Sequence, residues 1–378
     1  MGMTHVAYRS CAVFVVGVFA AVTAGCHGGG EWEPLTEQKI YVSDKFFDVE
    51  VLDPERALVI GYGGKIISTE DGGFTWTHVD SGTDKGLFSI DFTDDKQTGW
   101  IVGESGLVLK TTDGGKTWKP QDPVAWLDGE CNDPEERRFR ELDRPCQFAY
   151  LFAVTVIDEN NVAFIGDKSI YGRTRDGGNT WEVETLTFLD EDISPDLLLA
   201  FEDPVLYDVE YLDENNGYIV GEFGKIYHTG DGGESWVQQQ KTVLDETVLD
   251  ILDLPTLFDV EFNGADNGIV VGLDGRIAVT SDGGADWNFV PNNVKDYIDP
   301  FYSAVILDNG VRWAVGASGQ AVMAPADQPF AKGHLGSAVN SWIRRIRFYD
   351  NKTGWLVGGF GLIMSTSDGG ETWYRRLG

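Results

Sequence analysis

The chain is poor in positive charge. Its 378 residues contain 29 Lys and Arg against 61 Asp and Glu, which gives a formal net charge of −32 at pH 7. A polyanion of this kind is repelled by phosphate backbones and anionic lipid headgroups, so we exclude a nucleic-acid role. The sequence also lacks a run of the ~18 apolar residues that a membrane-spanning helix needs.

Residues with catalytic chemistry are scarce as well. The five histidines are scattered, without the spacing of metal ligands. The sequence has no Gly-x-Ser-x-Gly, no His-Glu-x-x-His and no phosphate-cradling glycine loop. The acidic stretch Asp190-Glu191-Asp192 lacks the spaced ligands of a calcium loop. We therefore expect no enzyme activity, no cofactor and no metal site.

The N-terminus has the features of an export signal. Arg9 is followed by a short apolar core from Cys11 to Val22 and then by Thr23-Ala24-Gly25-Cys26, which resembles a bacterial lipoprotein cleavage box. This pattern predicts a lipoprotein-type signal peptide over residues 1–25, lipidation of Cys26 and a tether with an N-terminal segment over 26–42. His27 after the cysteine favours the periplasmic side of the outer membrane or the cell surface. The alternative is ordinary secretion with cleavage near Ala24.

Four cysteines are present, and two of them lie outside the export signal. Cys131 and Cys146 fall in one insertion, and disulfides persist in an exported compartment. We predict that they pair, which would close a loop of about 15 residues and add roughly 3 kcal/mol in the chain-entropy model. The alternative is two free thiols.

A segment of eight residues is repeated six times. It begins with Thr, has Asp-Gly-Gly at its third to fifth positions and ends with Trp, as in Thr69 to Trp76. Because a motif repeated this often is typical of a scaffold, we interpret its aspartates as structural and not as acid–base or metal groups. The predicted structural pairs of this Asp-box are Asp71 and Trp76, Asp113 and Trp118, Asp176 and Trp181, Asp231 and Trp236, Asp282 and Trp287, and Asp368 and Trp373.

The residues before each Asp-box repeat too. Short runs with apolar and polar residues in alternation are separated by Gly, Asn or Asp, which indicates about four strands per unit of about 40 residues. We predict an all-β fold, a seven-bladed β-propeller of four-stranded antiparallel blades over residues 43–378. The sixth unit has Ala324-Pro325-Ala326-Asp327 in place of the motif, so we expect a looser corner there. The units begin at Phe47, Leu87, Leu151, Leu206, Leu257, Tyr302 and Ile343.

The turn residues have predictable roles. Glycines such as Gly103 and Gly106 can adopt positive φ and permit a two-residue hairpin between the second and third strands. The Asp-box carboxylate can accept backbone N–H groups and hold the turn between the third and fourth strands. The Trp that follows can bury its ring between blades.

Long insertions mark one face of the predicted propeller. The connections from Trp118 to Leu151, Trp181 to Leu206 and Trp236 to Leu257 join the outer strand of one blade to the inner strand of the next, on the face that also carries the hairpins between second and third strands. Two of these connections are acidic with apolar residues among the acids, which suits a partner-docking surface. The alternative is that the apolar residues cap the loops against the blades. The candidate partner-binding residues are Leu197, Leu198, Leu199, Phe201, Leu249 and Leu252.

The hairpin tips on this face form a mixed set without a repeated reactive residue. We interpret them as a candidate recognition ring, to which Tyr62, Phe223 and Phe360 contribute aromatic side chains. A basic cluster begins the last blade, and alternation along the strand places Arg345 opposite Arg344 and Arg347 on the side of Arg345.

The repeating unit resembles the photosystem II stability/assembly factor family, whose closing segment is the Asp-box or bacterial neuraminidase repeat. Gly354 to Gly358 beside Thr366 to Trp373 carries the specific part of the resemblance, which extends from about Phe47 to Trp373. The family implies a seven-bladed propeller without enzymatic activity that assists assembly of a membrane complex, and its photosynthetic members use an arginine-rich patch. This chain departs from the family in being acidic and poor in arginine.

Two functions follow from these observations. The first is a lipid-anchored scaffold or assembly factor that binds a membrane protein or membrane complex through the long-loop face, for a client that the sequence leaves unnamed. The alternative is a sialidase-like glycosidase or glycan-binding propeller, for which Arg56 is the arginine of interest in the first unit. The sequence leaves open whether Trp32 to Leu35 or Trp373 to Arg376 completes the last blade.

Overall fold

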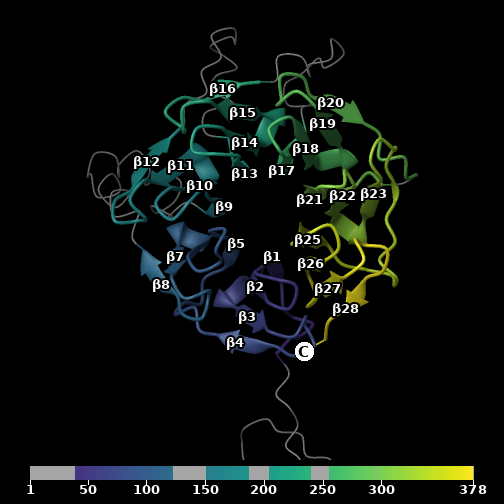
Figure 1. Ribbon diagram of the computed structural model, residues 1–378, viewed down its shortest axis with the longest axis horizontal. Helices are drawn as coiled ribbons and strands as arrows, with labels where there is room; N and C mark the ends of the chain where they lie inside the picture. Colours follow the sequence, from purple (N-terminus) through teal and green to yellow (C-terminus); the bar gives the residue numbers. More distant parts are fainter. Residues whose placement is uncertain (1–38, 122–149, 187–203, 240–254, 296, 378) are drawn as a thin grey trace, which may run out of the picture. The chain divides into compact units, whose positions relative to one another are not determined.

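The computed structural model describes residues 39–121, 150–186, 204–239, 255–295 and 297–377. Within them the strands form seven sheets, each of four antiparallel strands. Figure 1 shows the sheets arranged in chain order around a common centre, with the first strand of each sheet innermost. The predicted seven-bladed β-propeller is therefore confirmed.

Each blade is built from four strands that are consecutive in the sequence. The inner strands are β1 (Phe46–Val51), β5 (Leu87–Phe92), β9 (Leu151–Val156), β13 (Leu206–Tyr211), β17 (Leu257–Asn263), β21 (Phe301–Ile306) and β25 (Ile343–Phe348). The second strands are β2 (Ala57–Gly61), β6 (Gly99–Gly103), β10 (Val162–Gly166), β14 (Gly217–Gly221), β18 (Asn267–Gly272), β22 (Arg312–Gly316) and β26 (Gly354–Gly358).

The outer half of each blade is shorter and more exposed. The third strands are β3 (Ile66–Thr69), β7 (Val108–Thr111), β11 (Ile170–Thr174), β15 (Ile226–Thr229), β19 (Ile277–Thr280), β23 (Ala321–Ala324) and β27 (Ile363–Thr366). The outer strands are β4 (Thr77–Val79), β8 (Lys119–Gln121), β12 (Glu182–Thr185), β16 (Val237–Gln238), β20 (Asn288–Val290), β24 (Ala331–Lys332) and β28 (Tyr374–Arg375).

The propeller closes with its own C-terminal strand. The last blade consists of β25 to β28, and β28 pairs with β27 through Tyr374 and Arg375. The first blade packs directly against the last, since β1 contacts β25 and β26 and Lys45 forms an isolated bridge with Gly359. The sequence left open which of two segments completes the last blade. The C-terminal segment supplies its fourth strand, and Trp32 to Leu35 lie outside the described residues.

The up-and-down strand order gives the propeller two distinct faces. The turns between first and second strands and the Asp-box turns meet on one face, where the amide of Gly72 donates to the carbonyl of Glu55 over 2.8 Å. The other face carries the hairpins between second and third strands and the connections between blades, where the hydroxyl of Ser81 donates to the carbonyl of Gly64 over 2.7 Å. We call these the Asp-box face and the loop face.

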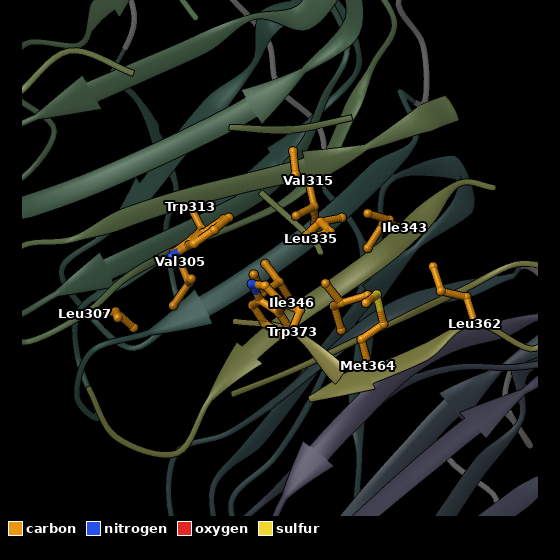
Figure 2. Close-up of a cluster of buried hydrophobic side chains, with 12 residues drawn as sticks. Val305, Leu307, Trp313, Val315, Leu335, Ile343, Ile346, Leu362, Met364 and Trp373 are labelled. Carbon is orange, nitrogen blue, oxygen red and sulfur yellow. The ribbon is translucent and has the colours of Figure 1, made fainter. Parts of the chain in front are cut away.

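Large side chains fill the space between blades. In Figure 2 the indole of Trp373, from the Asp-box segment of blade 7, lies against Trp313 of β22 in blade 6. The two ring centroids are 5.9 Å apart in an edge-to-face arrangement. Trp76 packs on Trp355 of the last blade in the same way, with centroids 5.9 Å apart. Repetition of this contact holds neighbouring blades together through apolar burial.

The prediction of two-residue hairpins between the second and third strands was wrong. The turns have three residues, for example Glu104–Gly106, and their positive φ falls on Ser105 and Gly106. Gly103 is extended, with φ of −172°. No side chain fits at this position, because a Cβ there would lie 2.1 Å from the carbonyl oxygen of Gly86. Glycine at the end of the second strand thus allows the connection from the preceding blade to pack directly against the backbone.

The Asp-box is a closed network of hydrogen bonds. In blade 4 the carboxylate of Asp231 accepts the amide of Ser235 over 2.9 Å and the hydroxyl of Ser235 over 2.6 Å. The hydroxyl of Thr229 also donates to Asp231, over 2.7 Å. The hydroxyl and amide of Ser235 together lower the pKa of Asp231 to about 2. The same carboxylate-to-hydroxyl and carboxylate-to-amide bonds recur at Asp71, Asp113, Asp176 and Asp368.

Candidate functional site

A β-bulge recurs near the start of every inner strand. In blade 1, Phe46 pairs with Gly61 and Asp48 with Ile60, so Phe47 has no partner in the register. A bulge inserts one residue and re-aims its side chain. The residues skipped in the seven blades are Phe47, Phe88, Phe152, Tyr207, Phe258, Tyr302 and Arg344.

Six of the seven bulged residues are aromatic and form a continuous chain of rings. Neighbouring centroids lie 5.2, 5.9, 5.5, 5.0 and 5.4 Å apart from the first blade to the sixth. Each side chain is half-buried. We call this set the aromatic belt: Phe47, Phe88, Phe152, Tyr207, Phe258 and Tyr302. Because inner strands begin on the loop face, the belt lies toward that face.

The last blade completes the circle in a different way. Arg344 occupies the bulged position, with its guanidinium 5.9 Å from the ring centre of Tyr302 and a hydrogen bond of 3.1 Å to the Tyr302 carbonyl. Toward blade 1, the ring of Trp342 stacks on that of Phe47, with the two centroids 5.8 Å apart. Burial and the neighbouring charge of Arg345 lower the pKa of Arg344 from its ordinary value. Among the described residues, no carboxylate lies within 4 Å of Arg344.

One residue further along five of the inner strands, an Asp or Ser side chain accepts a backbone amide of the next blade. The carboxylate of Asp48 accepts the amide of Ile90 over 3.1 Å, and Asp259 accepts that of Ala304 over 2.7 Å. Asp208 accepts the amide of Val260 over 3.0 Å. Ser89 and Ser303 make the equivalent bonds to Val154 and Ile346. These bonds join blade 1 to 2, 2 to 3, 4 to 5, 5 to 6 and 6 to 7, whereas blades 3 and 7 have Ala153 and Arg345 at this position.

Arg345 and Arg347 extend from the last blade into a network of buried carboxylates. Arg345 forms ion pairs with Asp48 of blade 1 at 3.2 Å, with Asp208 of blade 4 at 3.8 Å and with Asp259 of blade 5. Arg347 lies 3.4 Å from Asp48. It also lies 3.1 Å from Glu50 and 3.8 Å from Asp91, and Lys96 pairs with Glu50 at 2.8 Å. The alternation predicted for the arginine cluster is observed, since Arg345 and Arg347 share one direction and Arg344 takes another.

Part of this network lines a cavity of about 310 Å³, which we call the axial cavity, whose walls come from blades 2 to 7. Its charged lining residues are Asp91, Asp94, Lys96, Asp208, Glu210, Glu261, Arg345 and Arg347. Carboxyl groups outnumber cations in it. Burial and the nearby charge of Glu50 raise the pKa of Asp91 to about 6, although Arg347 opposes the shift. Burial and Asp259 raise the pKa of Glu261 to about 7. Burial raises the pKa of Glu210 as well, with Glu261 adding to the effect.

Some of the residues proposed from the sequence are placed and others are not. Tyr62 and Phe360 stand on loop-face hairpins and are both 58% exposed, and Phe223 is a half-buried residue of the equivalent hairpin in blade 4. Arg56 pairs with Asp53 at 2.5 Å, beside the turn between β1 and β2 on the Asp-box face. The remaining candidates lie outside the described residues and stay predictions: Cys26, Cys131, Cys146, Leu197, Leu198, Leu199, Phe201, Leu249 and Leu252.

The aromatic belt and the ion network are the features that the sequence reasoning missed. A signal was present, because most units begin with an apolar residue, an aromatic residue and a small or acidic residue in that order, as in Leu257-Phe258-Asp259. Alternation groups Phe258 with Val260 on one side of a regular strand, and only the bulge separates them.

Within the described ranges, no group of three or more His, Cys, Asp and Glu side chains is arranged to hold a metal ion. The same part of the chain contains no helix with the length and apolar character needed to cross a bilayer.

Comparison with known proteins identifies the relatives of this chain. A family model described as photosynthesis system II assembly factor YCF48 matches residues 29–133. The photosystem II assembly lipoprotein Ycf48 of Prochlorococcus marinus (strain MIT 9312) is 34% identical over 79 residues, which are 19% of this chain and 20% of that protein. The match thus spans about a fifth of the curated relative.

Two solved structures share the fold over most of their length. YCF48 bound to D1 peptide has a TM-score of 0.62 and 18% identity, and the match covers 88% of this chain and 94% of that one. YCF48 from Cyanidioschyzon merolae has a TM-score of 0.64 and 16% identity, with coverage of 86% and 96%. These two matches show the shared propeller fold, while the family model and the curated relative confirm the resemblance to photosystem II assembly factors that the repeated units predicted.

Proposed function

We propose that this chain, whose recognised relatives are photosystem II assembly factors, is a non-enzymatic scaffold that binds a membrane protein during assembly of a membrane complex. The observation that carries the proposal is the aromatic belt. It is a continuous, half-buried apolar surface on one face of a rigid propeller, and such surfaces on soluble folds are typical of protein interaction sites. One of the proteins of similar structure, YCF48, was solved bound to a D1 peptide.

Attachment to a membrane is the second part of the proposal. The curated relative is named a lipoprotein. Cys26 would carry the lipid here, and the glycine-rich residues after it would tether the propeller close to membrane proteins. The periplasmic side of the outer membrane or the cell surface remains our prediction, which fractionation of lipidated protein between inner and outer membranes tests.

The belt is joined on the loop face by the hairpin aromatics Tyr62 and Phe360 and, as we propose, by the apolar residues of the insertions around Leu197 to Phe201 and Leu249 to Leu252. A partner that contacts this face would bury apolar area on the belt and polar area on the rim, which is the usual pattern at protein interfaces. We propose no glycosidase activity.

Affinity capture of the lipidated protein from its native membranes tests this function. The wild-type chain is compared with a Phe152→Ala, Phe258→Ala variant of the belt, with a variant shortened over residues 186–204, and with Phe74→Ala on the Asp-box face as a matched control. Phe74 is 72% exposed, so its replacement leaves the core intact. We expect one membrane protein to be enriched by the wild type and by Phe74→Ala and to be lost from the belt variant. Equal capture by a folded belt variant would contradict the proposal.

A further inference from the structure

Arg344 interrupts an otherwise aromatic set. Six inner strands have Phe or Tyr at the bulged position, and the seventh has Arg. The belt therefore contains one cation, held at a defined place by the carbonyl and the ring of Tyr302.

Arg344 differs from Arg345 and Arg347 in its ion pairs. Arg345 and Arg347 are each paired with more than one buried carboxylate of the inner strands. Arg344 makes no ion pair among the described residues, and its one protein hydrogen bond there goes to the Tyr302 carbonyl at 3.1 Å. A guanidinium has five N–H donors in a planar fork that suits a carboxylate, so most of its capacity is unused.

The groups around Arg344 limit what could reach it. The belt side chains are apolar or carry a single hydroxyl, and Trp342 adds a further ring beside Phe47. Deeper in the propeller, Asp48, Asp208 and Asp259 surround Arg345 and would repel a second anion. An anionic group would therefore stop at the level of Arg344, with apolar groups around it.

We propose that Arg344 and the aromatic belt form a receptor for an acidic side chain, glutamate or aspartate, that the partner protein presents between apolar residues of an exposed loop. This inference rests on the proposed function and specifies the chemistry of its partner.

A side chain fits this site better than the end of a polypeptide. The methylene groups of a glutamate can lie against aromatic rings while its carboxylate pairs with the guanidinium. An inserted chain end would carry its last peptide groups into the belt, where buried N–H and C=O groups need partners that aromatic side chains do not provide. The partner loop would carry one acidic residue and not a run of them, because the net charge of −32 repels an acidic segment.

Binding of end-blocked peptides tests the inference. Two pooled libraries have randomised apolar flanks around a central Glu or a central Gln, and fluorescence anisotropy measures their affinity for the whole chain. We expect the wild type to prefer the Glu library by about tenfold. The preference should vanish in Arg344→Gln and persist in part in Arg344→Lys. In Arg344→Phe, which completes the belt, Gln peptides should bind as well as Glu peptides.

Arg312→Gln is the matched control, because Arg312 also combines one carbonyl bond, to Gln328, with one aromatic ring, Phe330, on the Asp-box side. It should keep the wild-type preference. A preference that survives in Arg344→Gln, or no binding of either library up to about 1 mM, would overturn the inference. Gln peptides with a free C-terminal carboxylate that bind as tightly as the Glu peptides would overturn the side-chain assignment in favour of a chain end. If belt-dependent capture of a membrane protein persists in any of these cases, the proposed function stands and only this inference fails.

Discussion

Arg345 in the inner strand of the last blade forms an ion pair with Asp259 in the inner strand of the fifth. The sixth blade separates these strands along the ring, so the contact joins two blades that are not neighbours and share no sheet edge. The same guanidinium reaches Asp48 in the first blade and Asp208 in the fourth. One side chain therefore connects four of the seven blades, and the propeller is held from its centre as well as between neighbours.

Removal of this arginine should destabilise the fold. Arg345→Gln keeps part of the volume but leaves Asp48 and Asp259, both almost fully buried, without their cation. Breaking a buried pair by removing one partner typically costs about 3–5 kcal/mol. We expect a loss of that size in the free energy of unfolding measured with urea. Arg375→Gln in the exposed strand β28 is the control and should change it by less than about 0.5 kcal/mol. Equal stability of the two variants would show that the network contributes nothing.

Stability should fall as the pH rises from about 5 to about 7.5. The pKa of Glu261 is raised from 4.5 to about 7 and that of Asp91 from 3.8 to about 6, so the folded state binds more protons than the unfolded state between these values. Stability then decreases with pH across this window, because the groups must ionise inside the cavity. We expect a decrease of about 2–4 kcal/mol in the free energy of unfolding, measured with urea at a series of pH values.

Glu261→Gln isolates one group in that series. It should match the wild type near pH 5, where Glu261 is protonated, and exceed its stability near pH 7.5. Superimposable curves for the two proteins, or a wild-type stability that rises over this range, would contradict the assignment.

The Asp-box should act on stability and not on binding. Asp231→Ala removes the acceptor of two bonds from Ser235 and one from Thr229. Loss of this acceptor should reduce the free energy of unfolding by about 1–3 kcal/mol. Capture of the membrane partner by the folded variant should be unchanged. If the variant kept the stability of the wild type but no longer captured the partner, the Asp-box would be a binding site and this prediction would be wrong.

Two glycine positions should differ in their tolerance of alanine. A Cβ at Gly103 would meet the backbone oxygen of Gly86 at 2.1 Å, so Gly103→Ala must displace the chain that links blades 1 and 2. We expect a loss of about 1–3 kcal/mol or more in urea unfolding. Gly72 has φ of +70°, and a methyl group added there would have no atom within 4 Å. Gly72→Ala should therefore cost about 1–2 kcal/mol through backbone strain alone. A cost at Gly103 below that at Gly72 would contradict the steric argument.

The fold followed from the sequence because its signals are local and repeated. Thr-x-Asp-Gly-Gly-x-x-Trp places a turn and an inter-blade ring in six units, and the alternation before it places the strands. The faces follow from strand order alone, which is sufficient to assign Tyr62 and Phe360 to the loop face. The hairpin length was missed because positive φ was expected at the glycines, Gly103 and Gly106. In the structure Ser105 adopts positive φ, which glycine usually provides.

The candidate site could not be predicted in the same way, because it depends on distances across the ring. Asp48 and Arg345 lie near opposite ends of the propeller sequence, and no local pattern indicates that they meet. The belt depends on a bulge that turns Phe47 away from the side shared with Val49. The side of the strand on which Phe47 lies follows only from the strand register, since alternation alone places Phe47 on the same side as Val49.

A photo-crosslinking amino acid placed on either face gives the most direct test of where this protein binds. One variant carries the crosslinker at Phe258 in the aromatic belt and a second carries it at Phe74 on the Asp-box face, and both are irradiated in native membranes. The proposed scaffold predicts a covalent adduct with one membrane protein from Phe258 and none from Phe74. An adduct with a membrane protein from Phe74 and none from Phe258 would place the partner on the opposite face and contradict the account.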